Sequence, residues 1–209
     1  MTCVDLLVTH PMTGHSTDLA RTVRRALKAL AKPRIAHCVI GATALAVRGF
    51  PRMTRDLDLT VRAEDTEAAL SALRSTGLQP QTPAESDQEF EPMVLLRDPV
   101  TDVEVDLLAA SGDPERTVIH EATRTLVFGV RAPVATLEHL LILYLYSNQP
   151  RHLGDFATIV QSGQADLARA ERGLRQMHRE MLPEWKRRVG LALSPPPRFP
   201  RPGRNRGPA

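Results

Sequence analysis

The chain has 209 residues, of which 42 % are hydrophobic and only 4 % aromatic, so it can bury a core made mainly of aliphatic side chains. Its net charge is +3, but four arginines lie between Ser194 and Ala209; removing them leaves the rest of the chain at −1, which excludes a body with a strongly basic nucleic-acid surface. Because there is no apolar run of roughly 18 residues, no signal-peptide pattern and no disulfide framework from Cys3 and Cys38, we expect a cytoplasmic protein that does not enter a membrane.

Helical and strand-like patterns alternate through the first part of the chain. Leu19, Val23, Ala26 and Leu30 recur at helical spacing, and later apolar or alternating runs between turn residues are typical of strands. In chain order we expect a helix at 16–31, a strand at 35–40, a short helix at 42–48, a strand at 56–61, a helix at 64–75, a hairpin of strands at 93–97 and 103–108, a short helix at 114–121 and one or two strands within 125–134.

From residue 136 onward the pattern is purely helical. Residues 194–209 are rich in Pro and Arg, a composition that predicts a disordered tail. The chain is therefore predicted to be of the α/β (α+β) class, with an N-terminal segment at 1–15, a mixed core at 16–135, a helical C-terminal cap at 136–193 and the tail at 194–209.

Two carboxylates stand out on the strand predicted at 56–61. Asp56 and Asp58 are two residues apart, so both side chains face the same side of a strand, while Leu57 and Leu59 face the other. Neighbouring carboxylates repel each other, and hard oxygen ligands on one face suit Mg²⁺ or Mn²⁺.

A second strand repeats this alternation with Glu104 and Asp106. If it lies beside the first strand, three or four carboxylates converge, which is enough to hold two divalent ions around a triphosphate. Alternating acids also mark the wet face of a half-exposed strand, so this plainer interpretation stays open.

The segment before the first acidic strand reads as a strand, a glycine turn and a helix start. Gly41, Ala42 and Thr43 form this turn, and backbone amides at such a place can hold phosphate oxygens with the help of the helix dipole. Arg52 and Arg55 flank the acidic strand and either bind phosphate or balance the charge of the aspartates.

These residues carry a resemblance to a known family. The string from Ile40 through Gly41 and Thr43 to the Asp56-Leu57-Asp58 strand, followed later by Asp106 on its own acidic strand, resembles the minimal nucleotidyltransferases of the DNA polymerase beta superfamily. Within that superfamily the sequence is most similar to AbiEii-type abortive-infection toxins. Arg151 and Asp155 are similar to the family's Arg-x-x-x-Asp element, although at this spacing they could also form an ordinary helix ion pair.

The resemblance implies a nucleotidyltransferase-like mixed sheet flanked by helices, and a division of roles among the residues. Asp56 and Asp58 would bind Mg²⁺ or Mn²⁺, and Asp106 would bind one ion and help to deprotonate the attacking hydroxyl. The nucleotide-binding group would comprise Gly41, Ala42, Thr43, Arg52, Arg55, Arg151 and Asp155. The expected reaction moves a nucleoside monophosphate from a nucleoside triphosphate to an acceptor, either RNA or protein, and an antitoxin protein would be a partner.

One position departs from the family pattern. The family usually places a lysine before the Arg-x-x-x-Asp element, and this chain has Tyr144 there, with no lysine between Lys32 and Lys186. Two alternatives therefore remain open beside the toxin-like enzyme: a weak or inactive relative that binds nucleotide or a protein partner, and an antibiotic nucleotidyltransferase.

Overall fold

The computed structural model describes residues 15–81 and 93–195, in which the strands form one seven-stranded mixed sheet. The strand order is β3–β4–β5–β2–β1–β7–β6. The strands are β1 (His37–Val39), β2 (Asp56–Arg62), β3 (Gln79–Pro80), β4 (Met93–Arg97), β5 (Glu104–Ala110), β6 (Thr123–Val127) and β7 (Val130–Val134).

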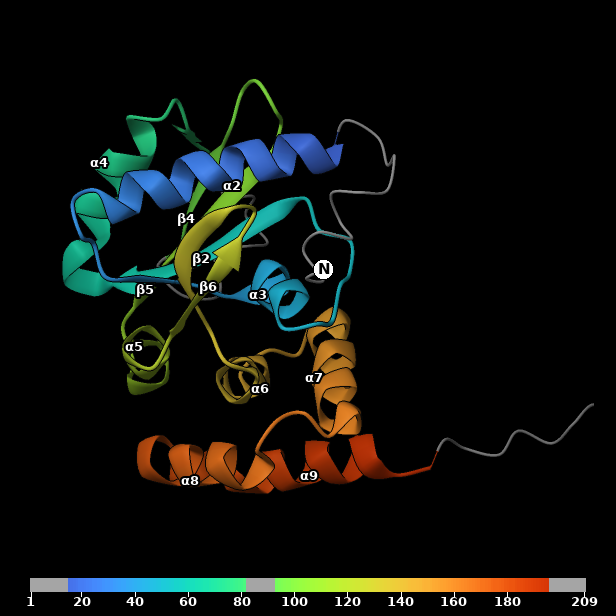
Figure 1. The fold of residues 1–209 in the computed structure, drawn as a ribbon. Coiled ribbons are helices and arrows are strands. Elements are labelled where there is room, and N and C mark those ends of the chain that lie inside the picture. Colours follow the sequence, from blue (N-terminus) through green and yellow to red (C-terminus); the bar gives the residue numbers. More distant parts are fainter. Residues whose placement is uncertain (1–14, 82–92, 196–209) are drawn as a thin grey trace, which may run out of the picture.

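Helices lie on both sides of this sheet. Figure 1 shows α2 and α4 on one face, α5 and α6 on the other, and α8 and α9 as an outer layer beyond α6 and α7. The α-helices are α2 (His15–Ala31), α3 (Gly41–Val47), α4 (Thr66–Arg74), α5 (Asp113–His120), α6 (Leu137–Leu145), α7 (Pro150–Ser162), α8 (Leu167–Met177) and α9 (Leu182–Leu193). The mixed α/β class expected from the sequence is confirmed.

The strand pairings bring the two acidic strands together at the centre of the sheet. β2 pairs with β5 in parallel and with β1 in antiparallel orientation, while β1 pairs with β7 in parallel. Parallel neighbours need a long connection, and here helix α4 and the β3–β4 segment lie between β2 and β5 in the chain. The two strands therefore begin at the same edge of the sheet, and each begins with an acid.

Most predicted elements occur where the sequence placed them, with local differences. The strand expected at 35–40 is shortened to β1, and the helix expected at 64–75 begins with a 3₁₀ turn at Ala63–Asp65. The two-residue strand β3 was not predicted. Phe128 and Gly129, both with positive φ, form the tight turn between β6 and β7, and phenylalanine is an unusual residue in such a turn.

The apolar stripes of the helices meet the buried faces of the strands in one core. Val23 and Leu30 of α2 are fully buried, as are Leu57 and Leu59 of β2. In the apolar run from Leu140 to Tyr146 most side chains are buried in this core, whereas Leu143 is partly buried and Tyr146 is exposed. Among the described residues, no helix combines the length and apolarity needed to cross a membrane.

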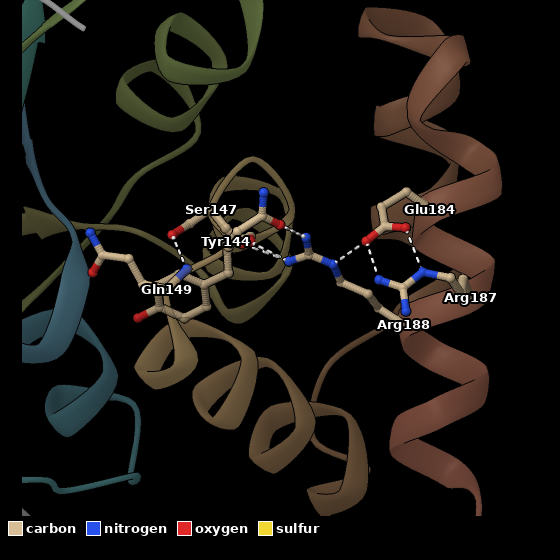
Figure 2. Close-up of polar contacts among 7 residues, drawn as sticks. Tyr144, Ser147, Gln149, Glu184, Arg187 and Arg188 are labelled. Atoms are coloured by element: carbon tan, nitrogen blue, oxygen red, sulfur yellow. Dashed lines mark hydrogen bonds and ion pairs between the residues drawn. The ribbon is translucent and has the colours of Figure 1, made fainter. Parts of the chain in front are cut away.

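A buried arginine on α9 fastens the end of α6. The side chain of Arg188 is only 5 % exposed, pairs with Glu184 at 2.6 Å, and donates to the carbonyl oxygens of Tyr144 at 2.8 Å and Ser147 at 2.9 Å. Figure 2 shows the guanidinium lying between the two helices. Because the last carbonyls of a helix have no partners within it, these bonds satisfy the carboxyl end of α6 and fix its position.

We expect Arg188→Ala to lower the free energy of unfolding by about 2–4 kcal/mol, because it removes a buried guanidinium and takes away its donors to the carbonyl oxygens of Tyr144 and Ser147. The Tyr144 oxygen keeps one donor, the backbone N–H of Ser147 at 3.1 Å. Arg187 is the matched control, since it also binds Glu184 but from an exposed position. Chemical denaturation should show little change for Arg187→Ala. Equal losses in the two variants would contradict the role assigned to Arg188.

Candidate functional site

Three aspartates gather where β2 and β5 begin. The parallel register places Asp58 opposite Asp106 and Asp56 opposite Glu104. The intervening residues Leu57 and Val105 are fully buried on the other face. The side chains therefore alternate as the sequence predicted, with the acids on one face of adjacent strands.

The electrostatics show that these carboxylates interact. Burial, followed by the negative charge of Asp56, raises the pKa of Asp58 to about 6. Burial, followed by the charges of Asp58 and Asp56, raises the pKa of Asp106 to about 7. In the described ranges none of the three forms an ion pair, so their repulsion is only partly offset by the more distant positive charges of Arg151 and Arg52.

Gly41 lies directly against one of these carboxylates. A Cβ atom at this position would be 1.8 Å from Oδ2 of Asp58, and the residue has a φ of +59°. Both the contact and the left-handed backbone therefore require glycine.

The turn at Gly41 donates backbone hydrogen bonds to Asp58. The backbone N–H of Ala42 donates to the Asp58 carboxylate, and the backbone N–H of Ile40 donates to the Asp58 carbonyl oxygen at 3.0 Å. The hydroxyl of Thr43 is buried without a hydrogen-bond partner in the described part of the chain. The predicted phosphate-holding turn is thus next to the carboxylates, but one of its amides already binds a carboxylate.

The arginines are arranged differently from the sequence-based alternatives. Arg52 donates through Nε to Oδ2 of Asp155 at 3.0 Å, and Arg151 donates through Nε to Oε1 of Gln149 at 2.7 Å. The alternative that Arg151 and Asp155 form an ion pair within the helix is therefore wrong. Asp155 instead binds an arginine from the loop before β2. Arg55 is exposed and forms no ion pair or side-chain hydrogen bond within residues 15–81 and 93–195.

Three further residues belong to this region. Tyr144 is buried and stacks on His152, with ring centroids 4.9 Å apart. Burial, followed by the positive charges of Arg151 and Arg52, lowers the pKa of His152 to about 4. The hydroxyl of Thr54 donates to the carboxylate of Asp56. No role in the site was predicted from the sequence for Thr54 and His152, although both lie inside the two motifs. Tyr144 stood out in the sequence only as the residue at the position of the family's usual lysine.

The donor set fits a divalent cation that also binds substrate. Among the described residues, no three His, Cys, Asp or Glu side chains are arranged as a group that could hold a metal ion by themselves. Magnesium, however, is commonly held by one or two carboxylates together with substrate phosphates. The carboxylates of Asp56, Asp58 and Asp106 offer hard oxygen atoms and uncompensated negative charge, so they suit an open site of that kind.

Comparison with known proteins relates the fold to nucleotidyltransferases. No family model and no curated protein matches the chain. The solution structure of the antibiotic-resistance factor ANT(2'')-Ia matches with a TM-score of 0.54 and 14 % identity, covering 84 % of this chain and 98 % of that one. The same factor in complex with adenylyl-2''-tobramycin matches with a TM-score of 0.52 and 14 % identity, covering 82 % and 97 %. The lincomycin-bound lincosamide antibiotic adenylyltransferase LnuA has a TM-score of 0.47 and 12 % identity, covering 66 % and 94 %. The matches to ANT(2'')-Ia show that the chain has the nucleotidyltransferase-like fold expected from its motifs.

The contact between Gly41 and Asp58 can be tested by adding a methyl group. Gly41→Ala should destabilise the protein by the strain of a left-handed alanine, about 1–2 kcal/mol, and by a further 1–3 kcal/mol or so from the clash. Gly163→Ala is the matched control, since Gly163 has a φ of +68° and no atom within 4 Å of an added Cβ. Thermal unfolding that shows equal losses would contradict the close contact.

The crowding of carboxylates predicts a pH-dependent stability in the absence of metal. The raised pKa values mean that the folded state holds these protons more tightly than the unfolded state, so their contribution to stability falls as pH rises from about 4 to about 7. In buffer with a chelator, Asp106→Asn should therefore be more stable than the parent at pH 8, by at least about 1 kcal/mol. This gain should shrink toward pH 4.

Glu104→Gln, an exposed change on the same strand, should shift the unfolding midpoint much less. A loss of stability in Asp106→Asn at pH 8 would show that the carboxylate is already compensated by the protein.

Proposed function

We propose that the chain is a divalent-cation-dependent nucleotidyltransferase, which moves a nucleoside monophosphate from a nucleoside triphosphate to an acceptor. The observation that carries this proposal is the register that sets Asp58 beside Asp106 on parallel strands, with Gly41 packed against Asp58. Such a cluster destabilises the fold in the absence of a cation, and it lies on a nucleotidyltransferase-like scaffold.

In this proposal Asp56, Asp58 and Asp106 hold Mg²⁺ or Mn²⁺. When bound, the cation would offset part of the triphosphate charge and stabilise the charge that develops as the nucleotidyl group is transferred. The carboxylates fix its position, and Thr54 restrains Asp56 through their hydrogen bond.

The positive side chains facing the carboxylates would bind the remaining phosphate charge. Arg52 and Arg151 both act electrostatically on Asp58, which places their charges near the cluster. Arginine is suited to this because its guanidinium matches the geometry of phosphate oxygens. Arg55 and the turn at Gly41–Thr43 remain candidates for the same substrate, and Asp155 would act by holding Arg52.

Asp106 is the proposed proton acceptor. Burial and the neighbouring carboxylates increase its basicity, which suits general-base work near neutral pH. The acceptor oxygen forms a bond to the α-phosphorus, the bond from that phosphorus to the bridging oxygen of the β-phosphate breaks, and pyrophosphate leaves. The proton of the acceptor passes to the Asp106 carboxylate.

Two acceptor classes are each favoured by one observation. The likeness in fold to ANT(2'')-Ia, solved with adenylyl-2''-tobramycin, favours an antibiotic or another small hydroxyl compound. The motif resemblance to AbiEii-type toxins favours RNA or protein, with an antitoxin as partner. The buried Tyr144 at the position of the usual lysine favours a slow enzyme or a nucleotide-binding relative without activity.

The test begins with calorimetric titration of each common nucleoside triphosphate in the presence of Mg²⁺. We expect the parent chain to bind at least one, with Kd values in the micromolar range, on the order of 10 μM. Asp58→Asn should abolish Mg²⁺-dependent binding while leaving the fold intact, because the change removes charge with almost no change in volume. Glu67→Gln, an exposed change on α4, is the control and should bind normally.

Transfer is then measured with α-labelled triphosphate and three acceptor pools: aminoglycosides and lincosamides, total RNA, and total protein. Label that appears in one pool identifies the acceptor class. Triphosphate binding without label in any pool would support the inactive relative, and absence of binding to every triphosphate would refute the proposed function.

A further inference from the structure

The hydroxyl of Tyr144 is a buried donor without a partner. The side chain is only 4 % exposed, and its oxygen has no hydrogen bond within the described residues. Figure 2 shows Tyr144 at the end of α6, where Arg188 holds its backbone carbonyl. A buried polar group without a partner is costly, which indicates that this hydroxyl finds a partner in another state of the site.

The charges around this hydroxyl belong to the proposed substrate site. Burial, followed by the negative charge of Asp155, raises the pKa of Tyr144, and Asp58 acts in the same direction while Arg52 and Arg151 oppose it. The phenol therefore stays protonated at physiological pH and remains able to donate. Asp155 is the acidic group that affects it most strongly.

The contact between Asp155 and Arg52 is a single, partly exposed hydrogen bond. Arg52 makes one hydrogen bond to Asp155, through Nε, instead of the two-fold contact that makes such pairs strong. The side chain of Arg52 is 30 % exposed, whereas that of Asp155 is 13 % exposed. A bound triphosphate would therefore compete for Arg52 and leave Asp155 as a largely buried carboxylate without its partner.

We propose that Tyr144 is a positioning residue whose hydroxyl donates to Asp155 when Arg52 turns to the phosphates of a bound nucleotide. This inference rests on the proposed function and deepens it. The hydroxyl replaces the hydrogen bond that Asp155 loses, so Arg52 moves to the substrate without leaving a bare buried carboxylate. Stacking of Tyr144 on His152, together with the hydrogen bond between His152 and Ser147 at 2.7 Å, holds the phenol in place for this exchange.

The chain offers a matched control in its other tyrosine. Tyr146 lies two residues further on, and its hydroxyl already has a partner in Nδ1 of His178 at 2.5 Å. Removal of that hydroxyl breaks an existing bond, whereas removal of the Tyr144 hydroxyl breaks none in the free protein.

The experiment compares Tyr144→Phe with Tyr146→Phe by calorimetric titration with ATP, GTP, CTP and UTP in the presence of Mg²⁺, together with thermal unfolding of the free proteins. Tyr144→Phe should weaken binding of the preferred triphosphate about tenfold while leaving the melting temperature of the free protein unchanged or higher. Tyr146→Phe should leave the affinity for the triphosphate unchanged, and its melting temperature should be equal to or below that of the parent. Equal affinity of Tyr144→Phe and the parent would overturn the inference and leave the proposed function intact.

A double-mutant cycle tests the exchange itself. In the Asp155→Asn background, movement of Arg52 to the nucleotide leaves no unpaired carboxylate at position 155. Adding Tyr144→Phe should therefore change the Kd for the triphosphate less than about twofold. If Asp155→Asn does not fold, Arg52→Gln serves as the background, because no exchange occurs without Arg52. A full tenfold effect in either background would show that the hydroxyl acts on the nucleotide directly and would overturn the inference. Failure of the parent chain to bind any triphosphate would overturn the inference and the proposed function together.

Discussion

The parallel pairing of β2 with β5 forces Asp58 and Asp106 to lie side by side at the edge where both strands begin. Carboxylates in this position repel each other and lose hydration, and the pKa values of both rise as a result. A fold selected only for stability would replace one of them by a neutral residue, since uncompensated buried charge is costly. The central strands nevertheless carry both carboxylates, and pKa values perturbed in this way are commoner at functional sites than elsewhere.

The surrounding elements meet this cluster on three sides. Behind it, two residues of each strand are fully buried: Leu57 and Leu59 of β2, and Val105 and Leu107 of β5. The strands therefore cannot shift to relieve the repulsion. Beside it, Gly41 packs against Asp58 and allows α3 to begin there. Opposite it, α6 and α7 bring aromatic and positive side chains, and Arg188 holds the end of α6 through bonds to its last carbonyls. The position of Tyr144 at the end of α6 therefore depends on a contact with α9, the last helix of the described residues.

The ion pair between Arg52 and Asp155 links the strand part of the site to its helical part. It connects the loop before β2 to α7, across 103 positions of the sequence. Because the pair is monodentate and partly exposed, it is weak enough to rearrange, whereas the network around Arg188 is buried and multiply bonded. The helical part of the chain is thus held firmly at α9 and more loosely by Arg52 and Asp155.

The sequence by itself determined the elements and the chemistry they carry. Helical spacing in α2 and the alternation of acids with leucine or valine in β2 and β5 are local patterns, and backbone geometry converts them directly into faces. Only the tertiary structure decided the partners of Arg52, Arg151 and Tyr144. A side chain can contact groups that are near or far along the sequence, and local spacing does not select among them. The spacing of Arg151 and Asp155 suggested that they could form an ion pair. In the structure α7 packs beside the loop before β2, so Asp155 binds Arg52 instead, and Tyr144 stacks on His152.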